Sequence, residues 1–283
     1  MASRFPEDSV SAARTEFLFN RIKDLIDRIG SASMADVAKI CIAYRLSAVE
    51  RYVADRFGGR VQSGPFSGMR YTTGPKGSLF VPKAFGTYEA ELSPIFKQID
   101  RYSVFVDVGC AEGYFAVGCA RRNPDLQVFA FDIDPKARDS CRMLAEANGV
   151  SDRITIGERC TAEDLAAHAG RGTLVLVDIE GAEVDLLSSE ALATLARCDL
   201  IVETHPRRGG STRDILVDRL AKTHDVVVVE QTTRDPMQFP ELRKLGQLDR
   251  LLALWEGRGP EPWLFARARR SGQDRQSPAV GDS

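Results

Sequence analysis

Short, almost continuously apolar runs alternate with helical stretches from about residue 103 onward. The runs read SVFVDV, QVFAFD, RITIG, TLVLVD, DLIVE, DVVVVE and PWLFARA, and they begin at residues 103, 127, 153, 173, 199, 225 and 262. Strands that are apolar on both faces are typical of a parallel sheet covered by helices on each side. The pattern therefore predicts an α/β fold in which the first six strands are parallel.

The seventh run differs from the other six in how the chain reaches it. Residues 231–259 form an insertion with a helical stripe of leucines and a tryptophan between 245 and 255. No crossover helix follows the last run, and a parallel connection needs a crossover of about a dozen residues or more. We therefore expect this strand to pair antiparallel at the sheet edge, and the 245–255 stripe to form a lid or to pack at that edge.

Helical periodicity also marks the first 60 residues. Apolar residues recur at helical spacing between 18 and 29, and Ser33 with Asp36 resembles a capping box that opens a second helix. Two helices bury little surface alone, so they should pack on the main domain or on a second copy of the chain, forming a homodimer. The predicted organisation is a helical segment at 1–60, a Gly/Pro-rich connector with a pre-domain helix at 61–98, the α/β domain at 99–270 and a disordered tail at 271–283.

Composition narrows the classes of function. The net charge of -2 supplies no global positive field, so we expect no nucleic-acid partner and no membrane partner. No apolar run approaches the roughly 20 residues that span a bilayer, and the start MASRFPEDSV lacks the apolar core of a secretory signal. The six cysteines form no C-x-x-C pair, which favours reduced thiols and a cytoplasmic setting.

The strongest chemical pattern is VFVDVGCAEGYFA, where a buried strand ends in Asp107 and a glycine-framed turn leads into a helix. Gly109 allows a tight turn close to a ligand, and Gly113 lets the helix start against the strand. The dinucleotide pattern G-x-G-x-x-G fails twice, at Ala111 and Tyr114. A carboxylate at this strand end suits a ligand with an ammonium group rather than a pyrophosphate. An ordinary turn between strand and helix is the alternative.

The next strand ends in Asp132, which strengthens the case for a nucleoside-type ligand. A carboxylate at this place can accept hydrogen bonds from both hydroxyls of a ribose. The alternative, that it caps the following helix, is weaker because Asp134 already fills that place. Ile133 follows directly, where its side chain could lie against the face of an adenine.

The third strand leads to Thr161 and Ala162. The stretch 159–162 is where an adenine amino group would be met in this architecture. A capping box formed by Thr161 and Asp164 explains the same residues equally well. Both interpretations stay open on the sequence alone.

Acidic residues and a histidine follow the fourth and fifth strands. LVLVDIEGAE places Asp178 at one strand end, and DLIVETHP places Glu203 and His205 at the next. Ligands of open α/β sheets bind outside the carboxyl ends of the strands, so these side chains should converge opposite the cofactor. They could hold a divalent cation or act as a general base. Local hydrogen bonding of Glu203 and His205 before Pro206 is the alternative.

In this order and spacing, VDVGCAEGYFA, FAFDIDP, VDIEGAE and IVETHP resemble the FkbM-type methyltransferases, a class I family that depends on S-adenosylmethionine. The resemblance covers roughly residues 64–267 and includes FGTYEAEL upstream. It implies a Rossmann-like, seven-stranded, mostly parallel sheet with an antiparallel last strand and helices on both faces. It also implies O-methylation of a small molecule such as a sugar or natural product.

The same resemblance assigns roles to individual positions. The methionine part of the donor would meet Asp107, Gly109, Cys110 and Gly113, the ribose Asp132, the adenine Ile133, Thr161 and Ala162, and the methyl-transfer site Asp178. Asp178, Glu203 and His205 would carry catalysis, and Asp178 with Glu203 would hold Mg²⁺ or Mn²⁺ if a cation assists. Thr204 departs from the cation-dependent macrocin and catechol types, which often have a second acidic or amide ligand there, so the cation requirement stays open.

The implied reaction needs an acceptor hydroxyl held in line with the methyl group and deprotonated. His205, or a cation on Asp178 and Glu203, would bring about the loss of the proton. N-methylation, or methylation of a macromolecule, is the alternative within the enzymes, although no N-P-P-Y-type segment stands where DIEG does. An NAD-dependent oxidoreductase and a non-catalytic donor-binding module are the alternatives from other classes.

Overall fold

The computed structural model describes residues 34–71, 79–206, 211–259 and 262–269, together with the single positions 20 and 23. Apart from the single positions 20 and 23, the predicted helix between 18 and 29 lies outside the described residues, as do the cap at Ser33 and the tail at 271–283. The chain divides into two compact units. Unit 1 combines residues up to Gly58 with 80–82 and 234–256, and unit 2 contains 59–79, 83–233 and 257 onward.

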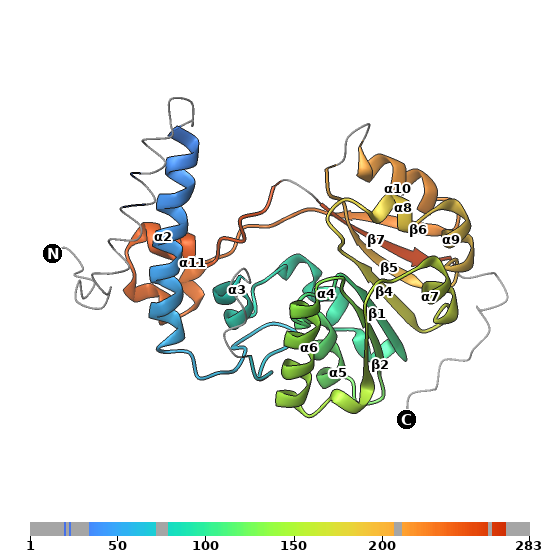
Figure 1. The fold of residues 1–283 in the computed structure, drawn as a ribbon, viewed down its shortest axis with the longest axis horizontal. Helices are drawn as coiled ribbons and strands as arrows, with labels where there is room; N and C mark the ends of the chain where they lie inside the picture. The colour runs from blue at the N-terminus through green and yellow to red at the C-terminus, as the bar shows by residue number, and fades with distance from the viewer. Residues whose placement is uncertain are drawn as a thin grey trace, which may run out of the picture. The chain divides into compact units, whose positions relative to one another are not determined.

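Unit 2 contains a seven-stranded sheet whose strands form where the apolar runs predict them. The strands are β1 Val104–Val108, β2 Gln127–Phe131, β3 Ile154–Gly157, β4 Thr173–Val177, β5 Asp199–Glu203, β6 His224–Val229 and β7 Trp263–Ala268. They lie in the order β3-β2-β1-β4-β5-β7-β6, and only β7 runs antiparallel to its neighbours (Figure 1). The predicted Rossmann-like sheet, with six parallel strands and an antiparallel last one, is confirmed.

The predicted edge position of the last strand was wrong. β7 pairs with β5 through Leu264 and Val202, and with β6 through Phe265 and Val227, so it lies between them and β6 forms the edge. The burial patterns give the physical reason. The first four residues of β7 are all buried, whereas β6 alternates and leaves Val227 55% exposed. A strand that is apolar on both faces belongs inside a sheet, and an alternating strand suits an edge.

Helices cover both faces of this sheet, as predicted (Figure 1). The α-helices are α2 Met34–Ala54, α3 Phe80–Phe85, α4 Ser93–Phe96, α5 Tyr114–Arg122, α6 Pro135–Asn148, α7 Ala162–Ala167, α8 Glu183–Leu186, α9 Ser189–Thr194, α10 Thr212–Leu220 and α11 Gln247–Ala253. The 3-10 turns are η2 Ala90–Leu92, η3 Ile99–Arg101, η4 Ser151–Arg153, η5 Pro236–Gln238 and η6 Leu242–Lys244. None of the described helices is both long and apolar enough to cross a membrane.

The two faces of β1 belong to different parts of the core. Val106 and Val108 pack in an aliphatic cluster with residues of β4, β5, α9 and α10. Phe105 lies on the opposite face, where its ring is 6.3 Å from that of Phe96. Because side chains alternate along a strand, Asp107 shares the face of Phe105 and points toward the aromatic layer and α5. This alternation determines where its carboxylate lies.

His224 begins β6, one residue before the apolar run that the sequence shows from residue 225. It is fully buried. Its two ring nitrogens lie 2.8 Å from the hydroxyl of Thr223 and 3.0 Å from the carbonyl oxygen of Cys198. A histidine whose two ring nitrogens are satisfied in this way has a structural place in the fold.

Unit 1 is organised around α2 and α11. The Arg45 guanidinium donates to both carboxylate oxygens of Asp249, at 2.5 and 2.7 Å. Asp249 is therefore on the buried side of α11, while Leu248 and Leu251 are 63% and 60% exposed. The expectation that the 245–255 stripe forms a lid or packs at the sheet edge stays a prediction. A homodimer through the N-terminal helices stays a prediction.

Candidate functional site

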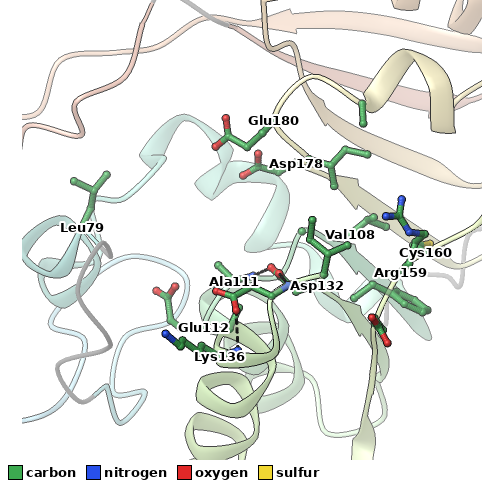
Figure 2. Close-up of a pocket in the computed structure, with 18 of the residues that line it drawn as sticks. Leu79, Val108, Ala111, Glu112, Asp132, Lys136, Arg159, Cys160, Asp178 and Glu180 are labelled. Carbon is green, nitrogen blue, oxygen red and sulfur yellow. Dashed lines mark hydrogen bonds between the residues drawn. The ribbon is translucent and has the colours of Figure 1, made fainter.

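A cavity of about 630 Å³ lies at the carboxyl ends of β1, β2 and β4 (Figure 2). The chain leaves β1 toward β2 on one side and later returns to β4 on the other, so this is the point where the strand order reverses. Six carboxylates and three cationic side chains line the walls, namely Glu112, Asp132, Asp134, Glu158, Asp178 and Glu180 with Lys83, Lys136 and Arg159. The excess of acidic groups favours a ligand that carries positive charge.

The turn after β1 forms one wall of this cavity. Gly109 has a φ of 89°, and a Cβ on it would lie 1.7 Å from the carbonyl oxygen of Asp178. Only glycine therefore lets the turn approach the end of β4 this closely. Ala111 also has a positive φ, 48°, and its N–H donates to Asp132 Oδ2 at 2.9 Å. The Asp132 carboxylate thus holds a strained turn in place.

Asp132 is less free than the sequence suggests. Its second oxygen, Oδ1, accepts the N–H of Asp134 at 2.8 Å, while Asp134 itself caps α6 as expected. Each carboxylate oxygen has two acceptor sites, so one site on each remains for a ligand in the cavity. Ile133 lines the same cavity and is 66% exposed. The end of β2 therefore offers two hydrogen-bond acceptors on Asp132 and, next to them, the apolar side chain of Ile133.

Asp107, Cys110 and Gly113 do not line the cavity wall, unlike Gly109. Asp107 is 1% exposed, and neither carboxylate oxygen has a hydrogen bond within the described part of the chain. Burial raises the pKa of Asp107 to about 8, the charge of Asp178 adds to this, and the nearby N–H of Ala116 opposes it. The direct contact of Asp107 with a donor stays a prediction.

Gly113 and its neighbour Cys110 serve the packing of the turn. A Cβ on Gly113 would lie 2.5 Å from the sulfur of Cys141 on α6, so the glycine allows α5 to start against α6. Cys110 is buried as a free thiol. These positions support the wall rather than form it.

At the end of β3, local capping accounts for Thr161. Its hydroxyl accepts the N–H of Asp164, and Asp164 accepts the N–H of Thr161, which completes the capping box of α7. Thr161 and Ala162 are absent from the cavity wall, whereas Arg159 and Cys160 just before them line it. The predicted segment is thus at the cavity, through its first two residues rather than its last two.

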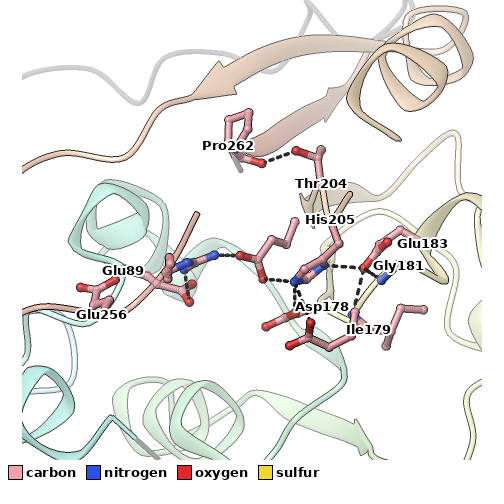
Figure 3. Close-up of polar contacts among 12 residues, drawn as sticks. Glu89, Asp178, Ile179, Gly181, Glu183, Thr204, His205, Glu256 and Pro262 are labelled. Atoms are coloured by element: carbon pink, nitrogen blue, oxygen red, sulfur yellow. Dashed lines mark hydrogen bonds and ion pairs between the residues drawn. The ribbon is translucent and has the colours of Figure 1, made fainter. Parts of the chain in front are cut away.

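Asp178, Glu203 and His205 come together as predicted. Figure 3 shows Asp178 beside His205. One ligand atom from each lies within 4.8 Å of the other two. His205 Nε2 is 3.3 Å from Glu203 Oε2 and 3.7 Å from Asp178 Oδ1. Asp178 also lines the cavity, so it joins the cavity to the cluster, while Glu203 and His205 do not line it.

Glu183, which the sequence reasoning did not select, orients the imidazole. Its Oε1 lies 2.8 Å from His205 Nδ1 and also accepts the N–H groups of Ile179 and Gly181. With Nδ1 committed to a buried carboxylate, Nε2 faces Asp178 and the cavity side. Burial alone would lower the pKa of His205, but the Glu183 hydrogen bond and the Asp178 charge outweigh it, so the pKa is raised.

Arg258 is the second residue that the sequence reasoning missed. It forms ion pairs with Glu203 Oε1 and with Glu89, and its side chain is 12% exposed. It lies in a stretch without periodicity between α11 and β7, so no sequence pattern marks it. Glu89 lies within FGTYEAEL, where only the family resemblance drew attention to it.

Thr204 connects strands and does not contribute to the cluster. Its hydroxyl donates to the carbonyl oxygen of Pro262 at 2.7 Å, and its N–H donates to the same oxygen at 3.3 Å (Figure 3). These bonds attach the end of β5 to the start of β7. The departure from an acidic residue at this position thus has a structural cause.

A buried ion pair between Lys83 and Glu112 also lines the cavity. Lys83 Nζ lies 2.5 Å from Glu112 Oε1, which also accepts the hydroxyl of Tyr71 at 2.8 Å. The Lys83 ammonium stands 4.6 Å from the centre of the Tyr88 ring. Burial would raise the pKa of Glu112, but Lys83 outweighs it and the pKa is lowered. This wall is charged and fixed before any ligand binds.

Backbone strain in the described chain is concentrated around the site. The non-glycine residues with left-handed φ are Glu89, Ala111 and Glu180, at 47°, 48° and 54°. Ala111 and Glu180 line the cavity, and Glu89 pairs with Arg258. Each such residue costs roughly 1–3 kcal/mol and persists only where its surroundings enforce it, which is common at functional sites.

Comparisons with known proteins give likeness in structure alone. No family model and no curated protein sequence matches the chain. A provisionally assigned O-methyltransferase from Klebsiella pneumoniae is 12% identical, with 89% of this chain and 97% of that chain covered and a TM-score of 0.42. The O-methyltransferase TomG from Streptomyces achromogenes, solved with S-adenosylmethionine, is 11% identical, with 79% and 89% covered and a TM-score of 0.44.

A third similar structure is named a decarboxylase rather than a methyltransferase. The precorrin 8W decarboxylase from Methanobacterium thermoautotrophicum is 19% identical, with 59% of this chain and 82% of that chain covered and a TM-score of 0.40. Likeness at this level concerns the fold and assigns no activity. The FkbM-type assignment therefore stays a prediction, and the function has to be argued from the site.

Proposed function

We propose that this chain is an S-adenosylmethionine-dependent methyltransferase that methylates a hydroxyl group of a small molecule. One observation carries the proposal: Gly109, Asp132, Ile133 and Asp178 line a single cavity at the reversal of the strand order. Gly109 lets the backbone approach a ligand closely, and Asp132 can accept hydrogen bonds from two neighbouring hydroxyls. Ile133 adds an apolar surface and Asp178 a carboxylate in the same cavity.

The residues present fit the donor. A volume of about 630 Å³ lies within the range of small-molecule sites. The free acceptor sites of Asp132 suit the ribose hydroxyls, and Ile133 offers an apolar surface to the adenine. The acidic walls suit a ligand with a sulfonium and an ammonium group. When bound, S-adenosylmethionine would supply an electrophilic methyl group.

The proposed base is His205. Its Nε2 is the nitrogen left available, because Nδ1 is held by Glu183. Nε2 would accept the proton of the acceptor hydroxyl, and the resulting imidazolium would be stabilised by Glu203 and Asp178 at 3.3 and 3.7 Å. Because the pKa of His205 is raised, the neutral, proton-accepting form increases as the pH rises through that pKa.

The alternatives fit the cavity less well. A dinucleotide would bring a pyrophosphate against a wall with more carboxylates than cations, at a turn where Ala111 replaces a glycine. The cluster around His205 offers a proton acceptor, which a neutral hydroxyl needs for attack and which a donor-binding module would not need. Both alternatives predict that the chain transfers no methyl group.

The test is a transfer assay. The protein is incubated with S-adenosylmethionine and sets of hydroxylated or amine-bearing small molecules, and S-adenosylhomocysteine is measured. We expect release with a hydroxyl acceptor, and a decrease in kcat of roughly 10²–10⁴-fold in His205→Ala. His168→Ala is the control, because His168 stacks on Phe129 and lies outside the group formed by Asp178, Glu203 and His205. Equal loss in both variants, or release only with amines, would contradict the proposal.

A further inference from the structure

We infer that Arg258 takes the place that a divalent cation would hold at Glu203, so that the site needs no metal ion. The inference rests on the proposed function for its meaning, but its geometry is independent of it. Asp178 and Glu203 are the carboxylates that the sequence offers to Mg²⁺ or Mn²⁺. In the structure a guanidinium already pairs with one of them.

Both oxygens of Glu203 have a cationic or ionisable neighbour. Oε1 pairs with Arg258, and Oε2 faces His205 Nε2 at 3.3 Å. Mg²⁺ needs oxygen ligands at about 2.0–2.1 Å in near-octahedral geometry. Binding at Glu203 would place the cation beside the guanidinium on the same carboxylate, where the two positive charges would repel each other. The donor set therefore does not fit a divalent cation while this ion pair is intact.

Arg258 is held on more than one side. Its second ion pair is with Glu89, whose side chain is fully buried, and its guanidinium carbon lies 5.4 Å from the centre of the Trp263 ring. Glu89 has a left-handed φ of 47°, a conformation that persists where neighbouring contacts impose it. An arginine with two carboxylate partners and an aromatic neighbour keeps both its charge and its position.

The arrangement has a consequence for His205. A cation between Asp178 and Glu203 would compete for His205 Nε2, because that nitrogen lies within reach of both carboxylates. A nitrogen that binds a metal ion cannot accept a proton. By neutralising Glu203 from its far side, Arg258 leaves Nε2 free for the acceptor hydroxyl. Arg258 is thus a positioning residue for Glu203 and, through it, for the imidazole.

The experiment measures Mn²⁺ binding by electron paramagnetic resonance on the whole chain. The wild-type protein should leave the signal of free Mn²⁺ unchanged at equimolar metal. Arg258→Gln removes the charge and should bind one Mn²⁺ at least about tenfold more tightly than the wild type. Arg258→Lys keeps a positive charge and should behave like the wild type, and adding Glu203→Gln to Arg258→Gln should abolish binding.

Arg269→Gln is the matched control, because Arg269 forms an exposed ion pair with Asp225 at the other end of β6 and β7. It should bind no Mn²⁺. Stoichiometric Mn²⁺ binding by the wild type would overturn the inference, and this measurement needs no variant to fold. A folded Arg258→Gln that binds no Mn²⁺ would overturn it as well.

Donor affinity, measured by calorimetry without added metal, keeps the two proposals apart. A protein that shows the expected Mn²⁺ pattern but binds no S-adenosylmethionine would retain the role of Arg258 at Glu203 and refute the proposed function. A protein that binds the donor but also binds Mn²⁺ in its wild-type form would refute the role of Arg258 and leave the proposed function standing.

Discussion

Glu183 Oε1 lies 2.8 Å from Nδ1 of His205, and this contact determines which imidazole nitrogen faces the cavity side. Glu183 is itself held by the N–H groups of Ile179 and Gly181 just after β4. The orientation of the proposed base is therefore built into the DIEGAE segment. Neither residue is useful alone: the carboxylate is fully buried, and the imidazole without it could turn either nitrogen toward Asp178.

Glu183→Gln should lower the pKa of His205. The substitution keeps a carbonyl oxygen for Nδ1–H but removes a negative charge that favours the imidazolium. The chain has three histidines, so proton NMR titration can follow each ring signal, with His205→Ala for assignment. The wild-type value should lie above the ordinary 6.5 and move down in the variant. An unchanged titration would show that Glu183 does not set the proton affinity of His205.

Asp107→Asn should stabilise the protein at alkaline pH. With a pKa of about 8, folded Asp107 keeps a proton that the unfolded chain loses above about 3.8. The free energy of unfolding should therefore fall between these values, by up to about 1.4 kcal/mol per pH unit. The asparagine of the variant cannot take up a proton in this way, so the stability of Asp107→Asn should depend less on pH. Urea unfolding at about pH 5.5, 7 and 8.5 measures the difference, and parallel curves for both proteins would refute it.

Gly109→Ala should abolish donor binding or prevent folding. The new Cβ would lie 1.7 Å from the carbonyl oxygen of Asp178, and the backbone at φ 89° disfavours a side chain in any case. Gly149→Ala separates these two causes, because Gly149 also has a positive φ, 66°, but no atom lies within 4 Å of its Cβ. It should lose only about 1–2 kcal/mol of stability. Thermal melts and donor titration compare the two, and similar behaviour would mean that the clash is relieved.

Much of the fold could be predicted because a strand that is buried on both faces appears in the sequence as a run of consecutive apolar residues. The seven apolar runs became β1 to β7, and the acids at their ends reached one region of the sheet. The position of β7 inside the sheet could not be predicted from its antiparallel direction alone. The sequence did hold one indication of it, because β7 begins with a continuous apolar run whereas β6 alternates between buried and exposed residues.

The site was predictable to the extent that its residues follow strands. Asp132 and Asp178 line the cavity for this reason, and Glu203 and His205 lie next to it. The partners that decide their chemistry come from elsewhere. Lys83 precedes the sheet and Arg258 lies in an irregular stretch, and the contacts they make depend on long-range packing that no local pattern encodes.

Asp132→Ala should weaken binding of S-adenosylmethionine by roughly 1.5–3 kcal/mol, the scale of hydrogen bonds to a charged group. Part of the loss should come from the turn, because Asp132 also holds the N–H of Ala111. Asp139→Ala is the matched control, because Asp139 forms an exposed ion pair with Arg142 on α6 and does not line the cavity. Calorimetry should show a small effect in the control. Equal donor affinity in wild type and Asp132→Ala would refute the ribose assignment.

The most direct test of the whole account is a calorimetric titration of the wild-type protein with S-adenosylmethionine and, separately, with NAD. The cavity joins an acidic wall, a diol acceptor at Asp132 and an apolar face at Ile133, and it lacks the glycines that a pyrophosphate needs. We expect one site per chain with a Kd in the micromolar range for S-adenosylmethionine and no measurable heat with NAD. Tight binding of NAD without any response to S-adenosylmethionine would contradict the account.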